Sequence, residues 1–120
     1  MADVARRFEL LGRAAQGGRY ALASYELGEI GEVFEGTLPK AALPKEGHPE
    51  VLPAMVTAFR QRDLPALGQA LDQHDPAAIA AAFEQTAHGC NGCHQASGHG
   101  FIVVPPELGE RVPDTRPAKP

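Results

Sequence analysis

The sequence predicts an all-α protein, arranged as an antiparallel four-helix bundle with an extended, proline-rich tail at its C-terminal end. Along most of residues 3–94, apolar residues recur at spacings of three and four, which is the repeat of one helical face. Glycines and prolines divide this region into four segments, and short connections between helices favour antiparallel neighbours. No such spacing continues beyond residue 104, where prolines become frequent.

Two helices are predicted within residues 3–35. Asp3 is a candidate N-cap of the first helix, and Gly17-Gly18 is expected to end it. The apolar stripe of the first helix consists of Val4, Phe8, Leu11 and Ala15. The second helix carries Tyr20, Ala23, Leu27, Ile30 and Phe34 on its apolar side. Its acidic side is expected to be a solvated face that would also suit a basic partner, and it holds Glu26, Glu29, Glu32 and Glu35.

The other two helices follow a connection over residues 36–49. The third is expected from about Glu50 to Gln73, with a kink or split at Asp63-Leu64-Pro65 because proline cannot continue a regular helix. Asp75-Pro76 predicts the start of the fourth helix, since aspartate caps a helix and proline fits its first position.

The fourth helix runs into a motif, Cys90-Asn91-Gly92-Cys93-His94, with the attachment pattern of c-type haem. Two thiols on one helical turn can form thioethers with the two vinyl groups of a haem, and the adjacent histidine can bind the iron. These are the only two cysteines of the chain, so no disulfide is expected. The helical repeat places His94 on the interior side, with Phe83 and Ala87 as candidate haem contacts.

Three other interpretations of the motif remain open. A zinc site would draw on Cys90, Cys93, His88, His94 and His99, although structural zinc usually binds two separated pairs of ligands. A dithiol redox centre would use the two cysteines alone, although such centres usually lie at a helix N-terminus, which lowers the thiol pKa. The third interpretation is a helical interaction module without a cofactor, in which both cysteines are simply buried.

A helical chain with Cys90-Asn91-Gly92-Cys93-His94 near its end resembles the class II c-type cytochromes, the cytochrome c-prime and cytochrome c-556 types. The resemblance covers residues 3–97 in architecture, but only residues 90–94 carry a specific motif. It implies one covalent haem c on the last helix of a four-helix bundle, with thioethers at Cys90 and Cys93 and His94 as the proximal iron ligand. It also implies the bacterial periplasm, an export signal already removed, and a possible homodimer.

On this interpretation, residues 1–104 form the haem-binding bundle and residues 105–120 an irregular tail. The segment from Phe101 to Pro106 is expected to pack back on the bundle or to cover a haem edge. Six-coordinate family members use a methionine of the first helix, which this chain lacks beyond Met1. Met55 is therefore either a distal ligand or core filler, and Phe8 and Leu11 are candidate apolar walls. Further possible donors are His48, His74, His88 and His99.

The sequence thus predicts a periplasmic electron carrier, not an enzyme, that exchanges electrons with a redox partner protein. The alternative is a five-coordinate haem protein that binds NO or CO for sensing, storage or detoxification, and the missing first-helix methionine favours it. With 15 acidic and 11 basic residues and a net charge of −4, the chain is unlike a nucleic-acid binder. No apolar run approaches the roughly 18 residues of a membrane helix, so no membrane span is expected.

Overall fold

The computed structural model describes residues 2–38 and 43–110, and all regular secondary structure in these residues is helical. The all-α prediction is therefore confirmed. The α-helices are α1 (Ala2–Gln16), α2 (Tyr20–Glu32), α3 (Leu52–Ala58), α4 (Leu64–Gln73) and α5 (Pro76–Ala96). Two π-helical turns, η1 (Val33–Thr37) and η4 (Phe59–Asp63), and a 3-10 turn, η3 (Pro49–Val51), complete the elements. None of the helices in the described ranges has the length and apolar character to span a membrane.

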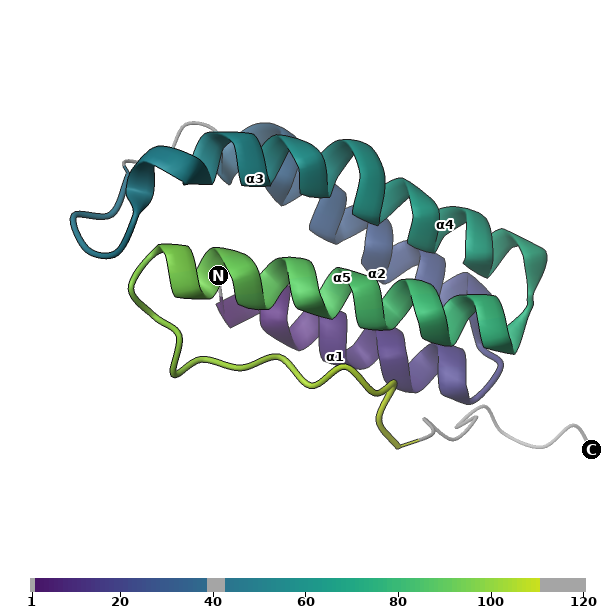
Figure 1. The fold of residues 1–120 in the computed structure, drawn as a ribbon. Helices are drawn as coiled ribbons and strands as arrows, with labels where there is room; N and C mark the ends of the chain where they lie inside the picture. Colours follow the sequence, from purple (N-terminus) through teal and green to yellow (C-terminus); the bar gives the residue numbers. More distant parts are fainter. Residues whose placement is uncertain (1, 39–42, 111–120) are drawn as a thin grey trace, which may run out of the picture.

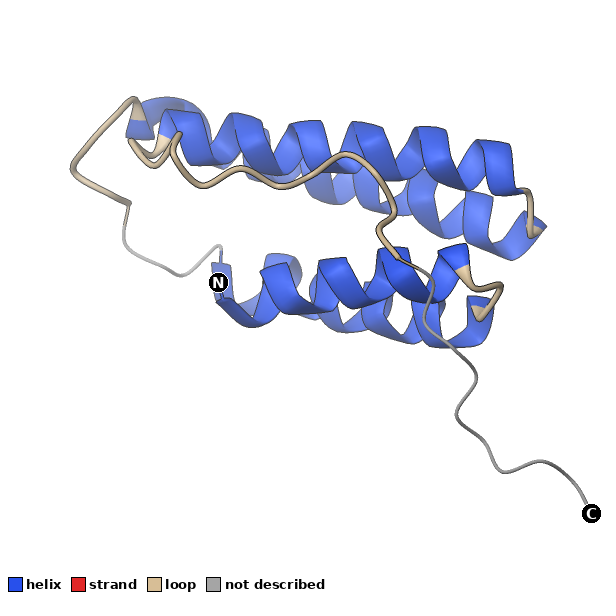
Figure 2. Ribbon diagram, turned by 90° about the horizontal axis from the view of Figure 1, so that it is seen from below, coloured by secondary structure: helices blue, strands red, loops and turns tan. Residues whose placement is uncertain are grey.

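The helices enclose one apolar core. α1 packs against α2, α2 against α4, and α5 against α1, α3, η4 and α4 (Figures 1 and 2). Two aromatic pairs join the elements across the core: Phe8 stacks on Phe83 with ring centroids 4.2 Å apart, and Phe34 meets Phe59 at 4.7 Å. The apolar stripe predicted for the first helix is buried throughout. Most of the free energy of folding in this arrangement comes from such apolar burial.

Two of the predicted helix boundaries are confirmed. Gly18 adopts a φ of 75°, a left-handed conformation that glycine takes without steric cost, and ends α1. At the start of α5, the carboxylate of Asp75 accepts hydrogen bonds from the backbone N–H groups of Ala77 and Ala78, at 3.1 and 3.4 Å. Asp3, by contrast, does not cap α1. The helix already begins at Ala2, and the Asp3 carboxylate accepts a hydrogen bond from Arg7 Nε at 3.0 Å.

The expected kink or split of the third helix takes the form of a π turn. α3, η4 and α4 follow one another without a break, and the backbone N–H of Leu64 donates to the carbonyl of Phe59, five residues back. The wider turn precedes Pro65, whose missing N–H falls in the first turn of α4. Proline therefore changes the hydrogen-bond register here and leaves the helical rod continuous.

The prediction that Glu26 lies on a solvated face is wrong. Its side chain is buried, and both of its carboxylate oxygens lie 3.3 Å from Arg7 Nη1. The physical reason is that this side of α2 faces α1, where the arginine neutralises the charge. Glu32 and Glu35 are exposed as predicted, and Glu29 is half-buried.

The chain beyond α5 returns along α5 and α1 without regular structure (Figures 1 and 2). Val104 and Leu108 pack against the core, as expected for a segment that folds back on the helices. Phe101, Ile102 and Val103 instead expose 80%, 45% and 68% of their surface. Residues 111–120 of the predicted tail lie outside the described residues.

We predict opposite effects of adding a methyl group at two helical glycines. A Cβ on Gly12 would lie 2.5 Å from the carbonyl oxygen of Leu108 and 2.7 Å from Cζ of Phe83. Gly12→Ala is therefore expected to lower the free energy of unfolding by about 1–3 kcal/mol. Gly28→Ala, where nothing lies within 4 Å, is the control and is expected to raise it by up to about 1 kcal/mol. Urea unfolding followed by circular dichroism measures both, and equal stability of the two variants would contradict the packing at Gly12.

Candidate functional site

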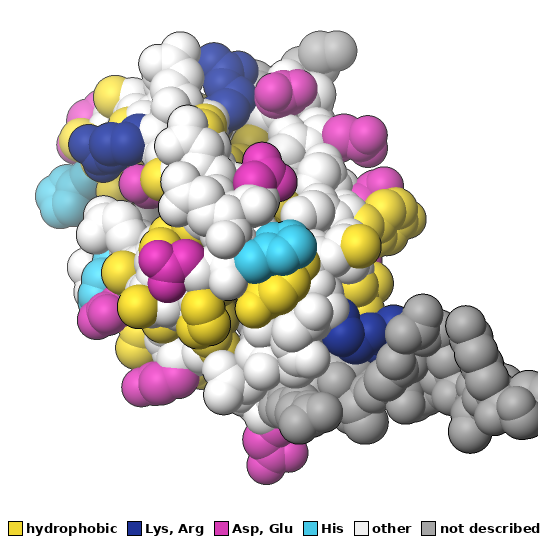
Figure 3. All heavy atoms as spheres, turned by 90° about the vertical axis from the view of Figure 1, so that its right-hand side faces the viewer, with side chains coloured by type: hydrophobic (Ala, Val, Ile, Leu, Met, Phe, Trp, Pro, Cys, Tyr) yellow, Lys and Arg dark blue, Asp and Glu magenta, His cyan; other side chains and the backbone are white. Residues whose placement is uncertain are grey.

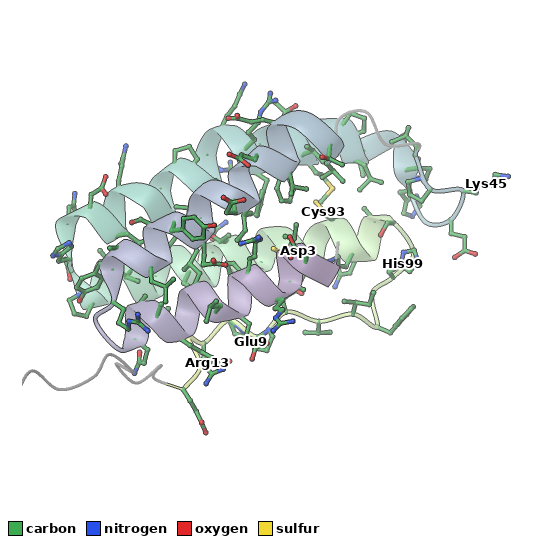
Figure 4. The ribbon with its side chains drawn as sticks, turned by 180° about the vertical axis from the view of Figure 1, so that it is seen from behind. Asp3, Glu9, Arg13, Lys45, Cys93 and His99 are labelled. Atoms are coloured by element: carbon green, nitrogen blue, oxygen red, sulfur yellow. The ribbon has the colours of Figure 1, made fainter. Side chains whose placement is uncertain are left out.

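The predicted motif lies in the last turns of α5, at the end of the molecule where α1 begins (Figure 1). Cys90 is half-buried and packs against the apolar core. Cys93 lies between the ribbons of α5 and α3, and His99 marks the end of the helix nearby (Figure 4). Both cysteines are free thiols, so the expectation of no disulfide between them agrees with the structure. Because they are three residues apart on one helix, both side chains can reach one ligand.

Two glycines of α5 allow the α3–η4 rod to approach the motif closely. A Cβ on Gly89 would lie 2.8 Å from Oδ2 of Asp63 and 2.8 Å from the ring of Phe59. A Cβ on Gly92 would lie 3.1 Å from Cε of Met55. Residues with side chains at these positions would push α3 and η4 away from the two thiols. Gly89, which precedes Cys90, and Gly92, the second x position of the Cys-x-x-Cys spacing, therefore have a packing role.

Met55, the candidate distal ligand, fills the contact between α3 and α5. Its methyl group lies against Gly92, which is about 160° around the helix axis from His94. The structure therefore brings Met55 to the opposite side of α5 from the histidine ring. Met55 is half-buried and lies outside the apolar core that the described residues form.

Both thiols sit in surroundings that keep them protonated. Burial raises the pKa of Cys90 to about 12, and the neighbouring Cys93 and Asp63 add to the effect. Burial and Asp63 also raise the pKa of Cys93. A dithiol redox centre and a zinc site both use thiolates, which these surroundings disfavour. Nor does any cluster of three or more His, Cys, Asp or Glu side chains suited to a metal ion occur in residues 2–38 and 43–110.

The ring of His94 is oriented by the segment that follows α5. Its Nδ1 lies 3.0 Å from the carbonyl oxygen of Ile102. A carbonyl can only accept, so Nδ1 carries the proton and Nε2 keeps its lone pair free for a metal. His94 is half-buried, and its Nδ1 edge faces the tail, so the expectation that it points into the interior is only partly met.

Asn91 holds the tail in this position. Its side chain donates from Nδ2 to the carbonyl of Val104 at 3.0 Å, and its Oδ1 accepts from the backbone N–H of Val104 at 2.7 Å. This pair of hydrogen bonds fixes the chain two residues beyond Ile102, and so helps to place the carbonyl that meets His94. The sequence interpretation did not identify Asn91. The only signal was an amide side chain inside the motif, able to pair with a backbone N–H and carbonyl at once.

The two predicted haem contacts are both buried core residues. Ala87 lies one turn before Cys90 on the same side of α5, next to the motif. Phe83 lies one turn further back, where its ring is covered by Phe8 of α1. Leu11, the second candidate apolar wall, is fully buried in the core. Ala87 is therefore adjacent to the motif, and the pair of Phe8 and Phe83 lies one helical turn further from it.

The four other histidines divide between the two ends of the molecule. His74 stacks on Tyr20 at the end opposite the motif, which Figure 3 shows with acidic, basic and apolar side chains side by side. His88 is exposed beside Glu84. His48 and His99 lie near the end of α5, where their backbone N–H groups donate to Ala96 and His94. The connection before α3 therefore does reach the motif end, but the His48 side chain is exposed.

Comparisons with known protein families, curated proteins and solved structures find no match to this chain. The function proposed below therefore depends on the chemistry of the site itself.

The pKa of the thiols predicts slow modification of the folded, haem-free chain. At pH 8 we expect iodoacetamide to alkylate Cys90 at least ~100-fold more slowly in the folded chain than in urea, because only the thiolate reacts. The unfolded chain loses the thiol proton first, so the free energy of unfolding should fall as pH rises above the ordinary thiol pKa of 9.0. Mass spectrometry of digested samples measures alkylation, and equal rates in the two states would refute the burial.

The Asn91 clamp predicts a local effect of Asn91→Ala. We expect amide exchange of residues 101–104 to accelerate at least ~10-fold, because two hydrogen bonds worth about 1 kcal/mol each are lost. Exchange in α1 and α2 should stay unchanged. Gln95→Ala, an exposed position on the same helix, is the matched control. Unchanged exchange in the tail of Asn91→Ala would show that the clamp does not hold it.

Proposed function

We propose that this chain is a monohaem c-type cytochrome, an electron carrier of the bacterial periplasm and not an enzyme. The observation that carries the proposal is one helical turn with two half-buried free thiols and a histidine whose Nε2 is free. We also propose the finer architecture of an antiparallel four-helix bundle over residues 1–104 with a tail over residues 105–120. The ring of contacts from α1 through α2 and α4 to α5 supports this arrangement.

The donor set fits haem c, since its thiols and imidazole have the spacing that this group requires. Cys90 and Cys93 would hold the haem through thioethers, and His94 Nε2 would be the proximal ligand. Such a haem supplies reversible one-electron chemistry between Fe(III) and Fe(II). In the proposal, the Ile102 carbonyl keeps His94 in one tautomer and one orientation, which limits reorganisation when an electron moves.

The chain also offers surfaces for a redox partner. The exposed apolar side chains of Phe101, Ile102 and Val103 lie directly beyond the histidine, and their segment supports the ligand. Glu32 at the end of α2 and Glu35 in η1 are exposed and would attract a basic protein. Docking of a redox partner needs such a surface and no substrate pocket, which is consistent with electron transfer.

Binding of NO or CO is the second candidate function. α1 contains no methionine, and Met55 packs against Gly92 on the side of α5 away from His94. With Met55 placed there, a haem iron held by His94 would be free to bind small neutral gases. Sensing, storage or detoxification would be the corresponding roles.

The test is production of the chain with an export signal and the haem-attachment machinery. The wild type is expected to retain one haem after denaturation, and Cys90→Ala/Cys93→Ala to retain none. His94→Ala should keep covalent haem but change its spectrum, whereas His74→Ala at the opposite end should change neither. Colourless wild-type protein would refute the proposal. A low-spin spectrum unaffected by CO assigns electron transfer, and a high-spin spectrum that shifts with CO assigns gas binding.

A further inference from the structure

Asp63 is a buried carboxylate that the proposed attachment chemistry does not use. Among the described residues, Glu26 and Asp63 are the two buried acidic side chains, with 4% and 5% of their surface exposed. Glu26 is paired with Arg7, whose guanidinium lies near both of its oxygens. Among the ion pairs of the described residues, Asp63 lies 3.4 Å from the Nε of Arg62, whose side chain is 72% exposed. The charge of this partner is therefore more strongly screened by water than that of Arg7, whose side chain is 28% exposed.

The Asp63 carboxylate faces the attachment turn of α5. Its Oδ2 would lie 2.8 Å from a Cβ on Gly89, which precedes Cys90 directly and Cys93 by one turn. The close approach therefore depends on glycine at position 89. Asp63 is also the last residue of the π turn η4, where the extra residue rotates it by about 100° relative to a regular helix.

The charge of Asp63 reaches the attachment turn, where it contributes to the raised pKa of Cys90, whereas Glu26 does not. A haem attached at Cys90 and Cys93 would lie within the same field. Because Fe(III) haem carries one more positive charge than Fe(II) haem, a nearby carboxylate stabilises the oxidised form.

We propose that Asp63 is a positioning residue for the electrostatics of the haem site, and that its carboxylate lowers the reduction potential of the haem. This inference rests on the proposed function. Asp63 makes no bond to the group and acts only through its charge. A unit charge about 10 Å away, at an effective dielectric constant of about 20, changes such an equilibrium by roughly tenfold.

The first experiment is a spectroelectrochemical titration of the haem-loaded chain at fixed pH. Asp63→Asn is expected to shift the Fe(III)/Fe(II) equilibrium about tenfold toward Fe(II), which corresponds to a potential higher by about 59 mV for one electron. Asp63→Glu keeps the negative charge, so its Fe(III)/Fe(II) equilibrium is expected to lie within about threefold of the wild-type value. Glu26→Gln is the matched control, because it removes a charge that is equally buried but paired elsewhere. Absorption spectra check that iron ligation is unchanged.

A second pair of variants tests the inference without altering a buried residue. Arg62→Gln removes the exposed partner of Asp63 and is expected to lower the potential, opposite in sign to Asp63→Asn. Arg60→Gln removes the same charge from the same turn, and Arg60 has no such contact with Asp63 among the described ion pairs. Equal potentials in the two arginine variants, or in Asp63→Asn and Glu26→Gln, would overturn the role of Asp63.

The haem-free chain separates this inference from the proposed function. There, Asp63→Asn should raise the alkylation rate of Cys90 by several-fold at pH 8, because the Cys90 thiolate loses a repulsive charge. An unchanged rate overturns the electrostatic reach of Asp63, whatever the haem result. A wild-type chain that never acquires haem overturns the proposed function instead.

Discussion

The close approach of α5 to its neighbours is the constraint on which the rest of the structure depends. Gly89 and Gly92 bring the α3–η4 rod against the motif, while Gly12 of α1 leaves room for the Phe83 ring and for the returning chain. The first two contacts hold the last turns of α5 against α3 and η4, and the third holds the middle of α5 against α1 and the tail. The Cys90 thiol therefore packs against the apolar core, and the histidine faces the tail. The local dielectric and the tautomer of the site both follow from this packing.

Much of the helical fold could be predicted from the sequence because its signals are local. The spacing of apolar residues, the cap at Asp75 and the left-handed Gly18 each depend on a few neighbours in the chain. The errors concern positions that are decided by another helix. Glu26 continues an acidic stripe in the sequence, yet Arg7 of α1 makes its burial possible. Asp3 has the chemistry of a cap, but an earlier helix start gave it a different partner.

The candidate site divides in the same way. The five residues of the motif are contiguous, so their spacing alone indicates the attachment chemistry. The groups that support them come from distant segments: the Ile102 carbonyl from the tail, and Asp63 from a π turn whose extra residue leaves no periodic signal. Asn91 lies inside the motif, but its role depends on Val104, which no spacing rule connects to it. The sequence therefore indicates the candidate donor atoms better than the surrounding groups that orient them.

The tail supports the motif through main-chain atoms. The carbonyl of Ile102 meets His94, and the N–H and carbonyl of Val104 meet Asn91, while the side chains of Phe101 and Val103 point to solvent. Any residue other than proline at position 104 can supply the same groups. In this segment, main-chain atoms therefore orient His94, while the exposed side chains form the surface. Under the proposed function, substitutions at its exposed positions would change which partner is recognised while the support of His94 is inherited unaltered.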